Sequence, residues 1–199
     1  MKRADVRDKL IESTIRSIAV NGLDKTTTKA IAAGAEVNEA YIYSHFADKE
    51  ALLVAAFDRL DDELMDCVLR ALPAMRMREL VLEDRCRIIF SAVWRFVLNN
   101  KERCLAFIRY FYSPYFTKYS VETHRLRCQP VLEQFKKVFK AESDIWMILN
   151  HVLNVLLDFA IKVFHEQMSA DDNYVEHVFL VIYRSIEPYF TKEEVQNNE

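Results

Sequence analysis

Apolar residues recur through most of the chain at the three- and four-residue spacing of amphipathic helices. Near the N-terminus this spacing predicts a helix from about Val6 to Val20. Its buried face comprises Leu10, Ile11, Thr14, Ile15 and Ile18. Two shorter patterns follow, from Thr27 to about Ala35 and from Glu39 to about His45, and a long helix is predicted from Lys49 to about Leu72.

Polar and special residues mark where these predicted helices begin and end. Thr27, Asn38 and Asp48 each stand just before a helix and have a side-chain oxygen that can accept a free amide of the first turn. Gly22 suits the left-handed conformation that ends many helices, and Pro73 ends the long helix. The result is a helix, a tight turn and a short second helix, which is helix-turn-helix geometry.

The remainder of the chain continues as longer amphipathic helices. Pro114 and Pro130 predict an irregular segment or broken helix over residues 113–125. The helices are expected at about residues 78–99, 101–112, 126–140, 144–168 and 172–190. The chain has only two glycines and four prolines, too few for the turns of a sheet protein, so we expect an all-α fold. A three-helix N-terminal domain over 1–50, reaching into the connecting helix 49–72, would precede a larger helical domain over 51–199.

Composition is that of a soluble globular protein. Hydrophobic residues make up 51% and charged residues 29% of 199. No apolar run approaches a membrane span of about 20 residues, and the charged start MKRADVRDKL lacks the core of a signal peptide. We therefore expect a cytoplasmic protein without membrane contact.

The spacings of Cys67, Cys86, Cys104 and Cys128 match no metal pattern, which favours reduced, buried thiols over a redox sensor. No metal and no cofactor are expected.

Net charge does not by itself indicate nucleic-acid binding. The chain has a formal charge of −3, and residues 1–50 contain eight Lys or Arg and eight Asp or Glu. Attraction to DNA would therefore have to come from the local placement of charge.

The short second helix combines hydroxyl, aromatic and small residues on its outer face, while Ile42 and Phe46 face inward. Such a helix can lie in the major groove of DNA. The candidate DNA-binding residues are Thr27, Thr28, Lys29, Asn38, Glu39, Ala40, Tyr41, Tyr43, Ser44, His45 and Lys49. The alternative is a three-helix bundle without a ligand, in which Tyr41 and Tyr43 are packing residues and His45 is structural.

About 50 residues resemble the TetR family of bacterial transcriptional regulators, most densely in IYSHFADKEALL and in the spacing of Ile11, Gly22, Thr27, Ile31 and Val37. The resemblance implies an all-α homodimer with an N-terminal DNA-binding domain and a C-terminal ligand-binding and dimerisation domain. It also implies DNA contacts by seven of the candidates, with Tyr43 and Lys49 on phosphates and Ala40 and Tyr41 closest to bases. The other three are Thr27, Asn38 and His45.

Two acidic residues depart from the family pattern. Glu36 stands in the turn where relatives usually have glycine, and a left-handed backbone there would cost about 1 kcal/mol. Glu39 stands where many relatives have a basic or small polar residue. It either accepts from a cytosine amino group as a specificity element or points to solvent.

The C-terminal domain contains no catalytic motif, so we do not expect an enzyme. Its aromatic residues at helical spacing are either core or the lining of an apolar ligand pocket. The pocket candidates are Phe90, Trp94, Phe107, Tyr110, Phe111, Tyr115, His151, Asn154 and Asp158. The last three share one narrow helix face with Lys162, which is either solvent-exposed or an edge of the pocket or dimer seam.

The last two long helices are apolar around a wide part of their girth, which favours a dimer. Candidates for its seam are Phe164, Phe179, Val181 and Ile182. The sequence thus predicts a homodimeric, ligand-responsive regulator, most simply a repressor released from a near-palindromic double-stranded DNA operator by a small apolar or aromatic effector. The alternative is a helical binding module that has lost DNA recognition and acts through protein partners.

Overall fold

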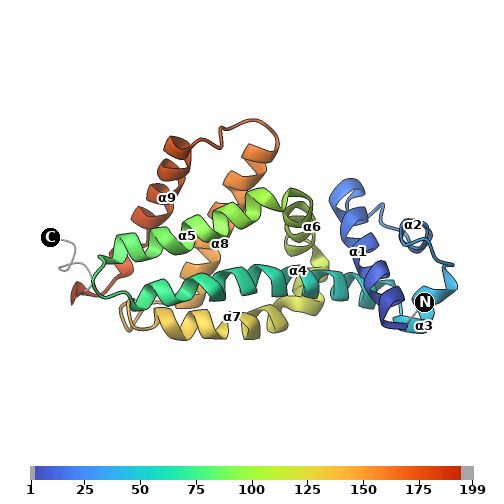
Figure 1. The fold of residues 1–199 in the computed structure, drawn as a ribbon. Coiled ribbons are helices and arrows are strands. Elements are labelled where there is room, and N and C mark those ends of the chain that lie inside the picture. The colour runs from blue at the N-terminus through green and yellow to red at the C-terminus, as the bar shows by residue number, and fades with distance from the viewer. Residues whose placement is uncertain (1–2, 194–199) are drawn as a thin grey trace. The chain divides into compact units, whose positions relative to one another are not determined.

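The computed structural model describes residues 3–193, and within them the chain is helical, without a strand (Figure 1). The first helices are α1 (Arg3–Asn21), α2 (Thr28–Gly34), α3 (Ala40–His45) and α4 (Lys49–Ala71), followed by the 3-10 helix η1 (Leu72–Arg76). They are followed by α5 (Leu82–Asn99), α6 (Lys101–Phe111), the π-helical turn η2 (Phe116–Ser120) and α7 (Val121–Phe135). The chain continues with α8 (Ile145–Phe164), α9 (Asp172–Ile186) and the 3-10 helix η3 (Glu187–Tyr189). The prediction of an all-α fold is confirmed.

The chain forms two compact units, and neither is continuous in sequence. Unit 1 contains residues 1–63 and 100–126, and unit 2 contains residues 64–99 and 127–199. Helix α4 therefore contributes its first part to unit 1 and its last part to unit 2. A DNA-binding domain limited to residues 1–50 stays a prediction, because the packing groups these residues with later ones.

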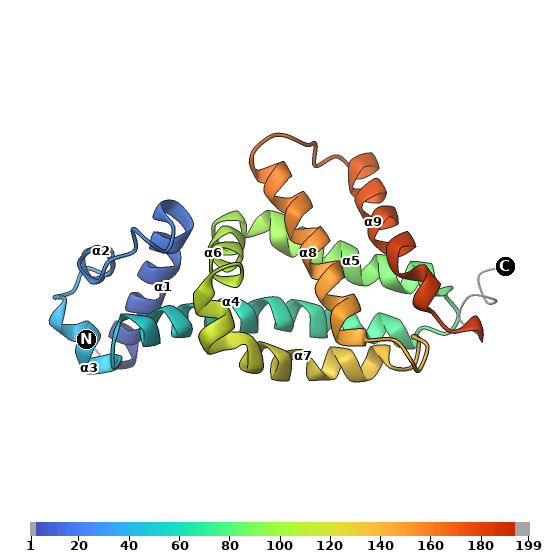
Figure 2. The same ribbon diagram turned by 180° about the vertical axis from the view of Figure 1, so that it is seen from behind.

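Unit 1 is built on the N-terminal helices. The predicted inward face of α1 is buried, as are Ile31 of α2, Ile42 of α3 and Phe46 behind it. Helix α6 packs along α1, as both ribbon views show (Figure 2). Phe57 of α4 stacks on Tyr110 of α6 with ring centroids 4.6 Å apart, so the core extends beyond the three N-terminal helices.

The predicted caps in unit 1 are present. Thr27 Oγ1 accepts from the Ala30 amide at 3.2 Å, and Asp48 Oδ1 accepts from the Ala51 amide at 2.7 Å. Asn38 Oδ1 accepts from the first amide of α3, that of Ala40, at 2.9 Å. Gly22 ends α1 with φ +80. Helices α2, α3 and α4 lie within one residue of their predicted limits, whereas α1 begins three residues earlier than predicted.

Unit 2 packs α5, α8 and α9 around an apolar core. Phe90 of α5 lies 5.5 Å from Phe179 of α9 between ring centroids, and Leu157 and Ala160 of α8 are buried. Helices α8 and α9 follow one another as an antiparallel pair joined by a short connection (Figure 2). Their N-caps are Asp144 and Asp171, whose carboxylates accept from amides of the first turn.

The middle of the chain departs from the predicted helix limits. Helix α7 covers residues 121–135 instead of 126–140, so residues 121–125 are helical and not irregular. Pro130 lies inside α7, where it removes the hydrogen bond to the carbonyl of Leu126. Leu126 is 72% exposed, so water can solvate that carbonyl and the helix continues. Helix α8 ends four residues early because Glu166 adopts a left-handed φ of +57.

Candidate nucleic-acid interface

Helix α3 exposes two tyrosines to solvent, whereas the apolar side chains that anchor it to the core are buried. Tyr41 is 49% exposed and Tyr43 is 60% exposed, whereas Ile42 is fully buried and Phe46 is 7% exposed. The tyrosines are therefore not packing residues, and no hydrogen bond among residues 3–193 engages their hydroxyls. Ala40 is also exposed, so the backbone at the start of α3 can approach a ligand closely.

A close contact joins α1 and α2, the helices that precede α3. Ser13 of α1 donates from Oγ to the Ile31 carbonyl of α2 at 2.7 Å. A Cβ at Gly34, the last residue of α2, would lie 2.5 Å from that same Oγ. Any larger residue at this position would therefore displace the Ser13 hydroxyl from its place against Ile31. Val37, in the turn, donates its amide to the Ala32 carbonyl at 3.1 Å and is half-buried.

The two acidic residues that depart from the family pattern, Glu36 and Glu39, each have a defined geometry. Glu36 has a φ of +57, the left-handed conformation that glycine adopts without strain. Glu39 is half-buried, and one of its two carboxylate oxygens is engaged within the chain. Its Oε1 accepts from Thr28 Oγ1 at 2.5 Å, which joins the start of α2 to the start of α3.

Several other candidate DNA-binding residues already make hydrogen bonds within the chain. Thr27 and Asn38 are occupied as caps, and Ser44 Oγ donates to the Tyr41 carbonyl at 2.8 Å. His45 and Lys49 are half-buried, whereas Lys29 is exposed. All eleven predicted DNA-binding residues belong to unit 1, on α2, α3, the turn between them and the start of α4.

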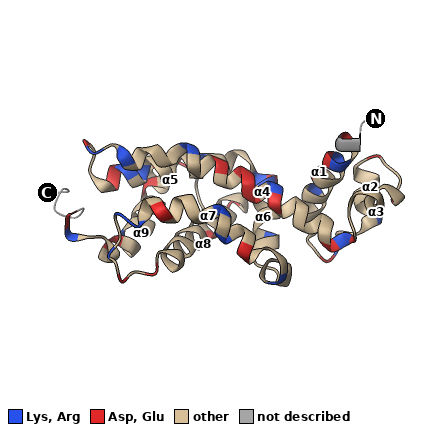
Figure 3. Ribbon diagram, turned by 90° about the horizontal axis from the view of Figure 1, so that it is seen from below, with Lys and Arg blue, Asp and Glu red and all other residues tan. Residues whose placement is uncertain are grey.

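Charge is sparse on the ribbon of α2 and α3 (Figure 3). Helix α3 contains no Lys, Arg, Asp or Glu, and Lys29 is the one charged residue of α2. The tyrosine hydroxyls, and not a basic helix, are therefore the main polar groups that α3 offers.

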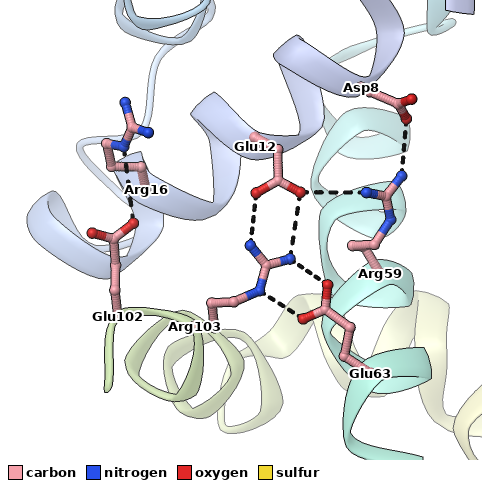
Figure 4. Close-up of polar contacts among 7 residues, drawn as sticks. All are labelled: Asp8, Glu12, Arg16, Arg59, Glu63, Glu102 and Arg103. Atoms are coloured by element: carbon pink, nitrogen blue, oxygen red, sulfur yellow. Dashed lines mark hydrogen bonds and ion pairs between the residues drawn. The ribbon is translucent and has the colours of Figure 1, made fainter. Parts of the chain in front are cut away.

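An ionic cluster connects α1, α4 and α6 in unit 1 (Figure 4). Arg103 of α6 donates to Glu12 of α1 at 2.6 Å and to both carboxylate oxygens of Glu63 of α4 at 2.6 Å. Arg59 of α4 joins it by donating to Glu12 and to Asp8, at 3.3 and 2.9 Å. Burial disfavours the charged form of Arg103, but its hydrogen bonds to Glu12 and Glu63 outweigh this and raise its pKa.

A second arginine of α6 caps α1. Arg109 Nη1 donates to the carbonyls of Ile18 and Ala19 at 2.7 and 2.8 Å. These carbonyls lie at the C-terminal end of α1, where a cation is also favoured by the helix dipole. Sequence reasoning missed both arginines, because 91 residues separate Arg103 from Glu12 and no local pattern links them.

Unit 1 also contains a buried polar pair that the sequence did not indicate. His124 Nδ1 lies 2.8 Å from Asp61 Oδ1, and the two side chains are 2% and 0% exposed. Phe57, Phe111 and Phe116 surround the imidazole, each with its centroid within 6.4 Å. Low surrounding polarity strengthens such a pair and makes removal of one partner costly.

The predicted pocket residues do not form one group. Phe107, Tyr110, Phe111 and Tyr115 belong to unit 1, and the other five belong to unit 2. In unit 2, Phe90 stacks on Trp94 at 5.8 Å, and the indole Nε1 of Trp94 is buried without a hydrogen-bond partner in the described part of the chain.

The polar face of α8 is partly explained. Asp158 is exposed and pairs with Lys162 at 2.5 Å, the ordinary i, i+4 contact. His151 is also exposed, and its Nε2 lies 3.0 Å from Ser185 Oγ of α9. Asn154 is half-buried.

The predicted dimer seam needs correction. Phe164, Phe179 and Ile182 are at most 7% exposed within a single chain, so they belong to the core and offer no surface to a partner. Val181 alone of the four is exposed, at 54%. The amphipathic pattern of α9 placed its apolar positions correctly on one face, but that face is covered by the chain's own helices.

Two expectations from composition have mixed outcomes. The four cysteines are free thiols, three of them buried, as predicted. The expectation that no apolar stretch approaches a membrane span is wrong, because α8 passes that test by length and composition. Core helices of soluble proteins pass it too, and α8 carries Asn154, Asp158 and Lys162. Within residues 3–193, no group of three or more His, Cys, Asp or Glu could hold a metal ion.

Residues 10–56 match the family model described as bacterial regulatory proteins, tetR family. A search of curated proteins found no match. A TetR family transcription regulator from Marinobacter aquaeolei VT8 is 21% identical, with 91% of this chain and 95% of that chain covered and a TM-score of 0.75. A TetR family regulator from Shewanella sp. PV-4 is 16% identical, with coverage of 94% and 99% and a TM-score of 0.78.

A third solved structure, the multidrug binding protein EbrR complexed with imidazole, is 19% identical, with coverage of 92% and 95% and a TM-score of 0.62. At these identities the structures show a shared fold, and the family model identifies the N-terminal domain. Proteins with this domain and fold are transcription regulators and not enzymes. Residues 10–56 are therefore a domain of the tetR family of bacterial regulatory proteins, in a chain that has the fold of TetR family transcription regulators.

Proposed function

We propose that the chain is a ligand-responsive repressor that binds a near-palindromic DNA operator as a homodimer. One observation carries the proposal: α3 exposes Tyr41, Tyr43 and Ala40 above buried Ile42 and Phe46. A helix seated in this way can enter the major groove without disturbing the core. Two copies related by a two-fold axis would read half-sites about 34–36 Å apart. Regulators of this family are soluble and cytoplasmic in general, and repression and dimerisation are typical of them.

Helix α8 supports the homodimer. In its most apolar stretch, only 28% of the residues are buried within the chain. Half-buried apolar side chains run along it, among them Leu153, Val155, Phe159 and Val163. Apolar side chains left partly exposed along a whole helix suit an interaction site, and the exposed Val181 on α9 belongs to the same unit. We therefore propose α8 and α9 as the surface that a second copy covers.

A small apolar or aromatic effector is supported by unit 2. The stacked Phe90 and Trp94 offer an aromatic environment, and the buried Nε1 of Trp94 can donate to an acceptor atom of a ligand. The imidazole complex of EbrR shows a small aromatic molecule bound to a protein of similar fold. The effector would act by favouring a conformation with lower operator affinity, which requires different affinities for the two states.

Fluorescence anisotropy with duplex DNA from the region flanking the chain's own gene tests DNA binding. Tyr43→Phe and Lys49→Ala should each weaken binding to all sequences alike, because both groups are assigned to phosphates. An affinity loss of about threefold to tenfold corresponds to one such contact. Tyr112→Phe and Lys137→Ala, outside α2, α3 and the start of α4, are matched controls and should leave affinity unchanged. Failure of the unaltered chain to bind any duplex at low salt contradicts the proposal.

That failure would favour the second function, a helical module acting through protein partners. The observation in its favour is the acidic pair Glu36 and Glu39 at the surface that would face DNA. A change in base preference with Tyr43→Phe would instead move Tyr43 from phosphate to base contact.

Sedimentation equilibrium tests the dimer. The chain has a mass of 23.4 kDa, and we expect twice that mass in solution. Val181→Arg should shift the protein towards the monomer, because a charge placed in a covered apolar surface is left without water or a partner. Leu126→Arg is the matched control: Leu126 is 72% exposed but lies on α7. A monomeric unaltered chain, or a dimer indifferent to Val181→Arg, argues against this surface.

A further inference from the structure

The contact between Thr28 and Glu39 lies within the proposed DNA-binding surface. Thr28 is the first residue of α2, and Glu39 immediately precedes α3. The hydroxyl of Thr28 donates to Glu39 Oε1 at 2.5 Å. Their sequence neighbours Thr27, Lys29 and Ala40 are exposed, so the pair stands at the surface although both side chains are half-buried.

This contact uses the one proton that Thr28 has to give. A threonine hydroxyl carries a single O–H donor, so a proton donated to Glu39 is not donated to a phosphate oxygen. Charge-assisted hydrogen bonds of this kind are roughly twice as strong as neutral ones. A DNA phosphate must therefore break a strong contact to engage Thr28.

The carboxylate itself opposes DNA. No lysine or arginine among residues 3–193 forms an ion pair with Glu39, so its charge is not neutralised by a direct contact. A carboxylate at the surface that approaches the phosphate backbone repels it, and this term is independent of sequence. Helices α2 and α3 supply only Lys29 against that charge.

We infer that Glu39 is an affinity-determining residue of this surface: it withholds the Thr28 hydroxyl from phosphate and lowers affinity for DNA. The inference rests on the proposed function, since it presumes that α2 and α3 face DNA. It assigns Glu39 neither to base reading nor to solvent. Thr28 becomes a phosphate ligand only when Glu39 is replaced.

A double-mutant cycle tests the inference, with the same labelled duplex and a fixed salt concentration. Thr28→Val alone should change affinity less than about twofold, because its hydroxyl already serves Glu39. Glu39→Ala should tighten binding by about threefold to tenfold, and Thr28→Val added to Glu39→Ala should weaken it by a similar factor. The two substitutions are thus expected to be strongly non-additive.

Two further variants separate charge from hydrogen bonding. Glu39→Gln removes the charge but keeps an acceptor for Thr28, so it should tighten binding less than Glu39→Ala. Glu36→Gln removes one negative charge from the same turn without touching Thr28, and it measures the general effect of charge. Thermal melts by circular dichroism should confirm that each variant is folded.

Two results overturn the inference while leaving the proposed function intact. One is an equal cost of Thr28→Val in both backgrounds, and the other is a gain from Glu39→Ala no larger than that from Glu36→Gln. A chain that binds no duplex in any variant overturns the proposed function as well, so the two failures are distinguishable.

Discussion

Single residues in the turn between α2 and α3 show where this chain carries local strain. Glu36 adopts φ +57, a conformation that costs a residue with a Cβ about 1–2 kcal/mol. Two residues earlier, Gly34 leaves room for the Ser13 hydroxyl, 2.5 Å from where a Cβ would be. Glycine is thus present at position 34, where a Cβ would crowd Ser13, and absent at position 36, where the backbone conformation favours it.

Glu36→Gly should therefore raise the free energy of unfolding by about 1 kcal/mol, since glycine relieves the left-handed strain. Urea denaturation followed by circular dichroism measures the change in midpoint. Glu166→Gly, at the other described non-glycine position with positive φ, should behave alike. A lower midpoint for both would show that these glutamates contribute contacts worth more than the strain.

The reactivity of each cysteine thiol is a second property that depends on the surroundings of a single residue. Burial raises the pKa of Cys104 to about 12, and it also raises the pKa of Cys67, with the charge of Arg70 opposing. Since the thiolate is the reactive form, both should resist modification near pH 8. We expect a thiol reagent to label the half-buried Cys86 first and the remaining three only after unfolding. Loss of the fast phase in Cys86→Ser checks the assignment, whereas fast labelling of Cys104 contradicts it.

At the scale of elements, α6 is the support on which α1 rests. Arg103 binds Glu12 and Glu63, and Arg109 caps the C-terminal carbonyls of α1. Arg103 is 25% exposed, which places its ion pairs between weak surface pairs and costly buried ones. Without it, Glu12 and Glu63 would face each other as like charges.

Arg103→Gln should consequently lower the free energy of unfolding by about 1–2 kcal/mol. The loss should shrink as salt rises, because added ions screen the remaining carboxylates. Arg16→Gln is the matched control: Arg16 pairs with Glu102 at 3.9 Å with both side chains more than half exposed. Its removal should have little effect, and equal losses for both variants would refute a special role for Arg103.

At the scale of the whole molecule, local patterns and long-range contacts were not equally predictable. Caps at Thr27 and Asp48 placed helix starts well, because capping depends on neighbours in sequence. The exposed face of α3 followed from its short amphipathic pattern. The sequence misplaces the limits of α7, because Pro114 and Pro130 suggest an irregular or broken segment over residues 113–125, whereas residues 121–125 are helical.

Contacts between distant segments left no such signal. Glu39 is separated from Thr28 by eleven residues, and Arg109 from the end of α1 by about ninety. Their partners are decided by how helices pack and not by spacing. For the same reason the predicted dimer residues Phe164, Phe179 and Ile182 proved to be core: amphipathicity shows which face is buried, but not what buries it.

The support of α1 by α6 has a consequence for protein engineering. A hybrid regulator made by exchanging residues 1–50 alone would leave behind Arg59, Glu63, Arg103 and Arg109, on which α1 depends. Its transplanted α1 would lose the arginine partners of Glu12 and the two hydrogen bonds that Arg109 donates to its C-terminal carbonyls. The unit that can be exchanged is therefore discontinuous in sequence. DNA specificity can be moved to another regulator only if the matching stretch of α6 is exchanged together with residues 1–50.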